Sequence, residues 1–350
     1  MFFVFPISAA LCRVRSVVSF CTSEALLHMI RKLLSFLGII LLLVLAVYGF
    51  AMLLGKQLLY PTFSRSAQKG IDIPGLSKGF TPQGVSYVGD YTLVCGYFPG
   101  SQSSRIYVVD AAGFANEVLL KKANGDAYTG HAGGLTAAGD YVYVSNASKL
   151  FVLRTSDLLA ARSGDYVAFI GEIEVACRAS FCSSDGEYVY VGEYHAVGYE
   201  TDESHRVATA DGDYQALVFA YRLDKSCRFG VQTSPTMAYA VRDCVQGFAV
   251  YNGVAVISCS KGFSSSHLYA YKTGTPDGAY FDNGRSIPMY TLDSAKLAGS
   301  LTMPHMSEDV EIRGGNILVG FESSAKKMLW GFFPCSVSNI MIVPMTALVK

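Results

Sequence analysis

Eight polar residues recur at matching places in a repeated sequence phrase, and their side chains have the chemistry to bind a ligand. Six stand at or near the start of a copy of the phrase and two stand at the end of the strand that follows it: Gln83, His131, Ser180, Gln246, Glu308 and Asp309, then Glu193 and Glu322. Carboxylate, amide and imidazole groups form hydrogen bonds, transfer protons and bind metals. The sequence therefore predicts a ligand site where these residues meet, but it assigns no catalytic residue.

The carboxylates in this set raise the question of a metal ion. Several carboxylates near one axis are costly unless they are paired with cations or bound to metal. Calcium prefers hard oxygen ligands, and Glu193, Glu308 and Asp309 would supply them. Side-chain carbonyls of Gln83 or Asn146 would complete the set. Calcium is therefore the candidate ion.

Each of these residues also has a structural explanation. Lys326 would neutralise Glu322 if the intervening segment turns. Gln83 and Gln246 could hydrogen-bond the backbone of a neighbouring repeat, and His131, which lies beside two glycines, could be packed in the interior. If these explanations hold, replacing the side chains lowers stability rather than binding.

The phrase that positions these residues is clearest between Gln246 and Ser258. A short strand runs into an Asn-Gly turn and a second apolar strand follows, as in a β-hairpin with a type I′ turn. Five copies have opening pairs whose second members are residues 84, 134, 180, 247 and 309, and each turn begins five residues later. The gaps of 50, 46, 67 and 62 residues are typical of four-stranded propeller blades or slightly longer.

We therefore predict an all-β fold, a β-propeller of five four-stranded blades, with a sixth blade built from both chain ends left open. In such a blade the start of the innermost strand and the end of the second strand lie on one face. The eight residues should therefore converge at one mouth of the central channel. We expect Tyr166–Glu174 and Ile287–Leu292 to be the outer strands of the second and fourth blades.

Several stretches resemble those of uncharacterised bacterial, secreted or membrane-anchored β-propeller proteins. They fall between residues 79 and 328 and include Thr81-Pro82-Gln83-Gly84, His131-Ala132-Gly133-Gly134, Val191-Gly192-Glu193-Tyr194 and Met306-Ser307-Glu308-Asp309. At the level of fold such proteins are similar to lactonase, esterase-like and quinoprotein-like propellers, an analogy that implies an architecture and not a reaction. The stretch after Lys327 departs from the pattern, which leaves closure of the last blade open.

The N-terminal part carries a membrane signal. Residues 33–54 contain no charge and are long enough to cross a bilayer as a helix. Arg31 and Lys32 precede them, so the positive-inside bias predicts a signal anchor with residues 1–32 in the cytoplasm and the rest of the chain outside the cell. A cleaved signal peptide is the alternative, but the apolar stretch exceeds a typical h-region. Residues 55–78 are then a linker, and residues 79–350 the propeller.

The first 28 residues are unusual before such an anchor. Met29-Ile30-Arg31-Lys32 followed by the apolar stretch is a complete start for an anchored protein. We hypothesise that translation begins at Met29 and that residues 1–28 are not translated.

Composition narrows the function classes. Lys plus Arg number 28 and Asp plus Glu number 28, so the charge balance gives no indication of a nucleic-acid partner. We expect no serine nucleophile of the α/β-hydrolase type and no nucleotide cofactor, since the corresponding motifs are not recognised. The nine cysteines contain no C-x-x-C pair, and a disulfide between Cys177 and Cys182 or between Cys227 and Cys244 is left open.

The resulting prediction is a membrane-anchored extracellular propeller that binds a small molecule, a glycan or a protein at its channel mouth. The alternative is a hydrolase or lactonase-like enzyme that uses channel carboxylates, His131 and a calcium ion. Binding is favoured because no nucleophile is recognised. The predicted partners are the membrane, through residues 33–54, and an unidentified ligand.

Overall fold

The computed structural model describes residues 8–331 and 333–349, except for the side chains of residues 8–23 and 329–331. The chain divides into two compact units, Met1–Gly55 and Lys56–Lys350. The hypothesis that residues 1–28 are not translated falls partly on residues 1–7, which lie outside the described residues.

The first unit is helical. Helix α1 covers Ser8–Leu59, and the described part of the chain contains one helical stretch, Glu24–Leu59, that is long and apolar enough to cross a membrane. The predicted span, residues 33–54, lies inside it. A membrane anchor and a signal sequence share these properties.

Residues predicted to be a linker are instead part of the second unit. They form helix α2 (Pro61–Ser66), strand β1 (Gln68–Asp72) and the 3₁₀ helix η1 (Leu76–Lys78). Pro61 suits the first turn of α2 because its missing N–H needs no partner there. Phe63 is buried, with its ring centroid 6.3 Å from that of Phe321. The linker prediction of residues 55–78 was therefore wrong.

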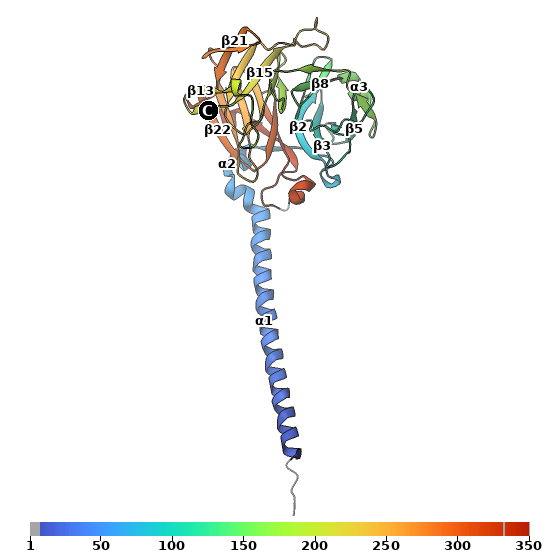
Figure 1. Ribbon diagram of the computed structural model, residues 1–350, viewed down its shortest axis with the longest axis vertical. Coiled ribbons are helices and arrows are strands. Elements are labelled where there is room, and N and C mark those ends of the chain that lie inside the picture. The colour runs from blue at the N-terminus through green and yellow to red at the C-terminus, as the bar shows by residue number, and fades with distance from the viewer. Residues whose placement is uncertain (1–7, 332, 350) are drawn as a thin grey trace, which may run out of the picture. The chain divides into compact units, whose positions relative to one another are not determined.

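In the described part of the second unit, five blades surround a central channel, which confirms the predicted β-propeller (Figure 1). The first blade, from the channel outward, is β2 (Thr81–Val88), β3 (Tyr91–Tyr97), β4 (Arg105–Val109) and β5 (Ala115–Lys121). The second is β6 (Gly134–Ala138), β7 (Tyr141–Asn146), β8 (Lys149–Arg154) and β10 (Gly171–Glu174). The third is β11 (Phe181–Ser184), β12 (Tyr188–Gly192), β15 (Ala216–Arg222) and β16 (Met237–Val241).

The remaining two blades follow the same plan. The fourth is β17 (Val245–Tyr251), β18 (Val254–Cys259), β19 (Ser266–Lys272) and β22 (Leu297–Met303). The fifth is β23 (Ser307–Arg313), β24 (Asn316–Phe321), β25 (Asn339–Pro344) and β1. Short elements between strands are α3 (Thr155–Ala160), η2 (Glu203–His205), the hairpin β13 (Val207–Thr209) and β14 (Gly212–Tyr214), η3 (Ser294–Lys296), η4 (Lys326–Gly331) and α4 (Met345–Leu348).

Closure of the fifth blade joins the two ends of the propeller sequence. Strand β1 pairs antiparallel with β25, so the outermost strand comes from the N-terminal side and the other three from the C-terminal side. This arrangement decides the count at five blades for the described residues. The irregular stretch after Lys327 leads into β25 and does not leave the blade open.

Two outer strands were assigned to the wrong blade. Strand β9 (Tyr166–Ala168), the first part of the predicted Tyr166–Glu174, pairs parallel with β5 of the first blade. Strand β21 (Arg285–Thr291) pairs parallel with β16 and, with β20 (Gly278–Asp282), extends the third blade. An edge strand presents unpaired backbone groups to any neighbour, and an alternating sequence does not say which edge it joins.

The innermost strands approach one another more closely than side chains allow. A Cβ atom added to Gly84 would lie 2.4 Å from the backbone nitrogen of Leu135 in the next blade. The corresponding distances are 2.6 Å from Gly134 to Cys182 and 2.6 Å from Gly247 to Val310. Glycine recurs in the opening pairs because neighbouring backbones occupy the space of a side chain.

The hairpin turns have the expected geometry. Asn252 and Gly253 have φ values of 49° and 74°, as a type I′ turn requires. Between blades, aromatic side chains fill the interior, as where the ring centroids of Tyr190 and Phe248 lie 5.2 Å apart.

Neither disulfide left open by the sequence is formed, since all seven cysteines with described side chains are free. The thiol of Cys177 donates to the carbonyl of Val191 at 3.4 Å, and that of Cys182 to the carbonyl of Tyr143 at 3.7 Å. Cys227 and Cys244 are also free.

The close approach of the inner strands predicts the effect of a single methyl group. Gly84→Ala should lower the free energy of unfolding by about 1–3 kcal/mol, because its Cβ overlaps the backbone of the next blade. Gly278→Ala is the matched control, since the nearest atom to its Cβ would be 3.8 Å away, on the flexible Met289. Thermal melts of the two variants test this, and equal melting temperatures would show that the inner strands tolerate a side chain.

Candidate functional site

The predicted mouth of the channel is a cavity of about 510 Å³ at the face where the innermost strands begin. Its lining includes six of the eight predicted residues: Gln83, His131, Ser180, Gln246, Glu308 and Glu322. They come from all five blades, because each inner strand starts, or each second strand ends, at this face. The structure thus brings together residues that lie up to 239 positions apart in the chain.

Glu193 does not reach this cavity. Its Oε1 atom lies 2.5 Å from Nδ1 of His205 and accepts a hydrogen bond from the backbone of Leu217 at 3.2 Å. Its other oxygen accepts from the backbone of Arg178 at 3.3 Å. Together with His205 it lines a separate cavity of about 650 Å³.

Asp309 does not line the cavity either. Its side chain is fully buried, and its Oδ1 atom accepts a hydrogen bond from the backbone of Val310 at 3.0 Å. Its Oδ2 atom has no hydrogen-bond partner among the described residues. Burial and the nearby charge of Glu311 raise the pKa of this carboxyl well above the ordinary value, which favours its uncharged form.

The three carboxylates predicted to bind calcium therefore do not share a site. Among the described residues no group of three or more His, Cys, Asp or Glu side chains is arranged to hold a metal ion. Glu193 is held by His205, and Asp309 is enclosed in the wall of the channel. The prediction that Glu193, Glu308 and Asp309 converge on one ion was wrong.

A hydrogen-bonded network joins the first and fifth blades at the mouth. The ammonium of Lys327 lies 2.7 Å from Oε2 of Glu322 and donates to the hydroxyl of Tyr97, also at 2.7 Å. The amide of Gln83 donates to the same Glu322 oxygen at 3.3 Å. Lys327, the residue after the predicted partner Lys326, thus neutralises Glu322.

This network sets the protonation of two neighbours. Glu308 is 5% exposed, and burial together with the negative charge of Glu322 raises its pKa well above the ordinary value, although Lys327 opposes this. His131 is in contact with the solvent of the cavity. Desolvation by the surrounding residues and the positive charge of Lys327 nevertheless lower the pKa of its imidazole to about 4. These shifts favour the protonated form of Glu308, whose hydroxyl can donate a hydrogen bond, and leave the His131 imidazole uncharged at neutral pH.

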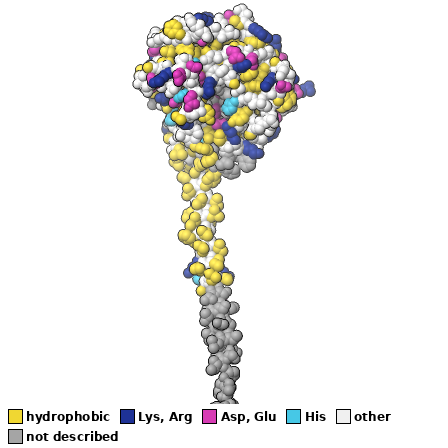
Figure 2. All heavy atoms as spheres, in the orientation of Figure 1, with side chains coloured by type: hydrophobic (Ala, Val, Ile, Leu, Met, Phe, Trp, Pro, Cys, Tyr) yellow, Lys and Arg dark blue, Asp and Glu magenta, His cyan; other side chains and the backbone are white. Residues whose placement is uncertain are grey.

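The structure adds residues that the sequence analysis missed. Cations and tyrosines complete the lining: Arg178, Lys261, Lys327, Tyr194 and Tyr199. Two of them directly adjoin positions already singled out, since Arg178 precedes the pair Ala179-Ser180 and Tyr194 follows Glu193. Figure 2 shows acidic, basic and histidine side chains close together on the visible face of the propeller.

With His131 uncharged, the uncharged form of Glu308 favoured and Glu322 paired, the cavity carries more positive than negative charge. Its described ionised side chains are Arg178, Lys261 and Lys327 against Glu322. A concave site with this excess attracts anions.

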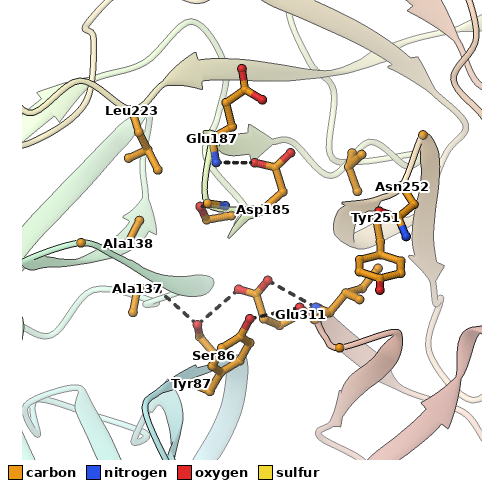
Figure 3. Close-up of a pocket in the computed structure, with 17 residues that line it drawn as sticks. Ser86, Tyr87, Ala137, Ala138, Asp185, Glu187, Leu223, Tyr251, Asn252 and Glu311 are labelled. Atoms are coloured by element: carbon orange, nitrogen blue, oxygen red, sulfur yellow. Dashed lines mark hydrogen bonds between the residues drawn. The ribbon is translucent and has the colours of Figure 1, made fainter.

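The hairpin-turn end of the channel holds a different cavity, of about 550 Å³ (Figure 3). Glu311 points toward Ser86 there, and the hydroxyls of Ser86 and Thr136 donate to one of its oxygens at 3.2 and 2.9 Å. Burial raises the pKa of Glu311 to about 8. The three residues belong to the fifth, first and second blades, so this carboxyl ties inner strands together.

One pentapeptide contradicts the expectation that no serine-hydrolase motif occurs. Gly75-Leu76-Ser77-Lys78-Gly79 has the spacing G-x-S-x-G. A nucleophile elbow places its serine in a sharp turn between a strand and a helix. Ser77 instead lies in the short 3₁₀ helix η1, exposed, and is not among the residues that line the mouth. The match in letters is not a match in structure.

Comparison with known proteins identifies no sequence family. No family model matches the chain, and no curated protein matches it. Solved structures with a similar fold include glutaminyl cyclase from Myxococcus xanthus, with 10% identity and a TM-score of 0.38, covering 79% of this chain and 94% of that one. A GH43 endo-arabinanase from Bacillus licheniformis has 10% identity and a TM-score of 0.42, covering 79% and 96%.

A GH43 β-xylosidase/α-arabinofuranosidase from a compost microbial metagenome has 9% identity and a TM-score of 0.43, covering 79% and 94%. Similarities this distant do not transfer an activity. The propeller assignment rests on the strand topology described above, and the chemistry of the mouth must be argued from its own residues.

The charge of Lys327 predicts the titration of its neighbour. In Lys327→Gln the pKa of His131 should rise from about 4 part of the way toward 6.5, because burial remains while the repelling ammonium is gone. Lys261→Gln is the matched control from the same cavity and should leave the value in place. NMR titration of the imidazole C–H signals measures both, and an unchanged His131 pKa in Lys327→Gln would contradict the proposed electrostatics.

Proposed function

We propose that this protein is a membrane-anchored extracellular β-propeller that binds a small anionic molecule or acidic glycan at its channel mouth. The observation that carries the proposal is the charge of the cavity: Arg178, Lys261 and Lys327 stand against one carboxylate, Glu322, which is itself paired. An anionic ligand would complete this balance. Cationic ligands would meet an excess of like charge.

The uncharged groups provide donors and stacking surfaces. Protonated Glu308 can donate a hydrogen bond to the ligand, as can the amide of Gln246 and the hydroxyl of Ser180. The rings of Tyr194 and Tyr199 meet edge to face, with centroids 5.8 Å apart. Aromatic faces beside polar groups suit sugar rings or other flat apolar surfaces, which favours a glycan or a small cyclic acid.

The anchor part of the proposal rests on sequence. The apolar stretch 33–54 lies in one continuous helix, and Arg31 and Lys32 precede it. Positive charge is retained on the cytoplasmic side, which places the propeller outside the cell.

The proposed topology makes a direct prediction. A reporter fused after Lys350 that is active only outside the cytoplasm should be active in intact cells, and external protease should digest the propeller. Replacing Arg31 and Lys32 with Glu is the control, because it removes the bias that orients the helix. Reporter activity confined to the cytoplasm in the wild-type chain would contradict the proposal.

A pair of substitutions at Glu308 tests the site. Glu308→Gln keeps a neutral donor of the same shape and should bind an acidic sugar such as galacturonate nearly as wild type does. Glu308→Ala removes the donor and should weaken binding roughly ten- to hundred-fold, the equivalent of about 1.5–3 kcal/mol for a hydrogen bond to a charged group. Calorimetry on the detergent-solubilised full chain, with galactose as the neutral control, measures this. Equal affinities for galacturonate and galactose would sink the proposal.

A hydrolytic function is the second candidate, supported by one specific observation. A carboxyl with a raised pKa beside a carboxylate is the arrangement used in general acid catalysis, and Glu308, whose pKa is raised, lines the same cavity as Glu322. The ion pair with Lys327 and the hydrogen bond from Gln83 hold Glu322 in place. Under this candidate Glu308→Gln would abolish turnover of an acidic glycan while retaining its binding.

A further inference from the structure

Apolar side chains are exposed around the channel-mouth cavity. Val197 and Tyr199 line it and are 89% and 63% exposed. Phe263 is 58% exposed and directly follows Lys261 and Gly262, which also line it. Single exposed apolar residues are ordinary, but three beside one charged cavity make an amphipathic rim. We call Val197, Tyr199 and Phe263 the apolar rim.

The rim is supported from below by aromatic packing. The ring of Phe263 lies 4.5 Å from that of Phe333 and 5.9 Å from that of His305, measured between centroids. These contacts hold Phe263 in place although its outer surface faces solvent. An apolar side chain that is held in one exposed position is suited to contact another apolar surface.

The loop that carries Phe263 is joined to the start of the propeller unit. The hydroxyls of Tyr60 and Ser265 lie 3.1 Å apart, and Phe63, three residues after Tyr60, is buried in the propeller core. Tyr60 lies six positions after Leu54, the last residue of the predicted span. Even fully extended, six residues reach about 20 Å. If residues 33–54 cross a bilayer, Tyr60 and the loop bonded to it stay close to the bilayer surface.

Positively charged side chains line the same cavity. Lys261 is two residues from Phe263, and Lys327 lines the cavity with Arg178. Aromatic residues prefer the boundary between headgroups and acyl chains, and clustered Lys and Arg side chains bind anionic headgroups. The apolar rim therefore suits the acyl part of a lipid, and the cations suit its anionic headgroup.

We infer that the ligand of the channel mouth is an anionic lipid of the membrane that anchors the chain. Its headgroup enters the cavity beside Lys261, Lys327 and Arg178, and the apolar rim rests on the acyl region. The inference rests on the proposed anchoring and on the proposed preference for anions, and it narrows the ligand to a membrane lipid.

A fluorescence experiment on the full chain tests the contact. The sequence contains one tryptophan, Trp330, so Phe263→Trp in a Trp330→Phe background gives a single reporter on the rim. Phe114→Trp in the same background is the matched control, because Phe114 is 77% exposed and lies outside the cavity lining. Both are placed in nanodiscs of phosphatidylcholine with phosphatidylglycerol and lipid carrying a doxyl quencher on its acyl chain. Quenching at residue 263 should exceed that at residue 114 several-fold.

Further arms identify the lipid and the source of the anion. Nanodiscs without phosphatidylglycerol, and Lys261→Gln in nanodiscs with it, should both reduce quenching at residue 263. Added glycerol phosphate should leave the quenching unchanged. If glycerol phosphate reverses it, the site takes a free phosphate ester and the inference is overturned. Tyr199→Trp supplies a second reporter on the rim should the first variant fold poorly.

Equal quenching at residues 263 and 114 would also overturn the inference. Failure of the proposed function is read separately in the same samples. Loss of the protein from the nanodisc fraction would refute the anchor. If the protein binds galacturonate but the reporter on the apolar rim is not quenched, the proposed function stands and the inference of a lipid ligand is overturned.

Discussion

The close approach of the five innermost strands is the constraint on which the rest of the structure depends. Gly84, Gly134 and Gly247 lie where the backbone of the next blade leaves no room for a side chain. Side chains beside these glycines must then point to the mouth or into the channel. Polar groups from every blade meet within one cavity for this reason, and any buried carboxyl among them is desolvated. The raised pKa values of Glu308 and Asp309 are a direct consequence.

The hydrogen-bonded network around Lys327 affects the charge of the side chains at the channel mouth. By pairing with Glu322 and Tyr97, Lys327 links the end of the fifth blade to the first, near the place where β1 closes the ring. The same ammonium lowers the pKa of His131. It also lowers the pKa of Glu308, against the effect of Glu322, which raises it. One cation thus joins two blades and favours an uncharged His131, while burial and Glu322 raise the pKa of Glu308. The remaining excess of positive charge comes from Arg178 and Lys261.

Repetition explains both what could be predicted from the sequence and what could not. The recurring hairpin predicted the blades, their number and the mouth, because each copy obeys the same local rules of turn and strand. Strand β1 was not predicted, because its partner β25 is distant in the sequence and no local sequence pattern indicates the pairing. Glu193 matches its counterparts in sequence, yet its side chain lies 2.5 Å from His205, which belongs to the long segment between β12 and β15, and the two line a separate cavity. Lys327 and Lys261 were missed because neither stands at a repeated position, and Lys326, the residue before Lys327, was predicted to pair with Glu322 instead.

The central claim is that the channel mouth is a binding site for an anion presented at the membrane. Cryo-electron microscopy of the full chain in nanodiscs containing phosphatidylglycerol tests it most directly. The account predicts density for a lipid in the cavity, with the headgroup against Lys261 and Lys327 and the acyl chains extending past Phe263. A map that resolves the Tyr194 and Tyr199 rings but shows only solvent between them and Glu308, or places lipid density solely against another face, would contradict it.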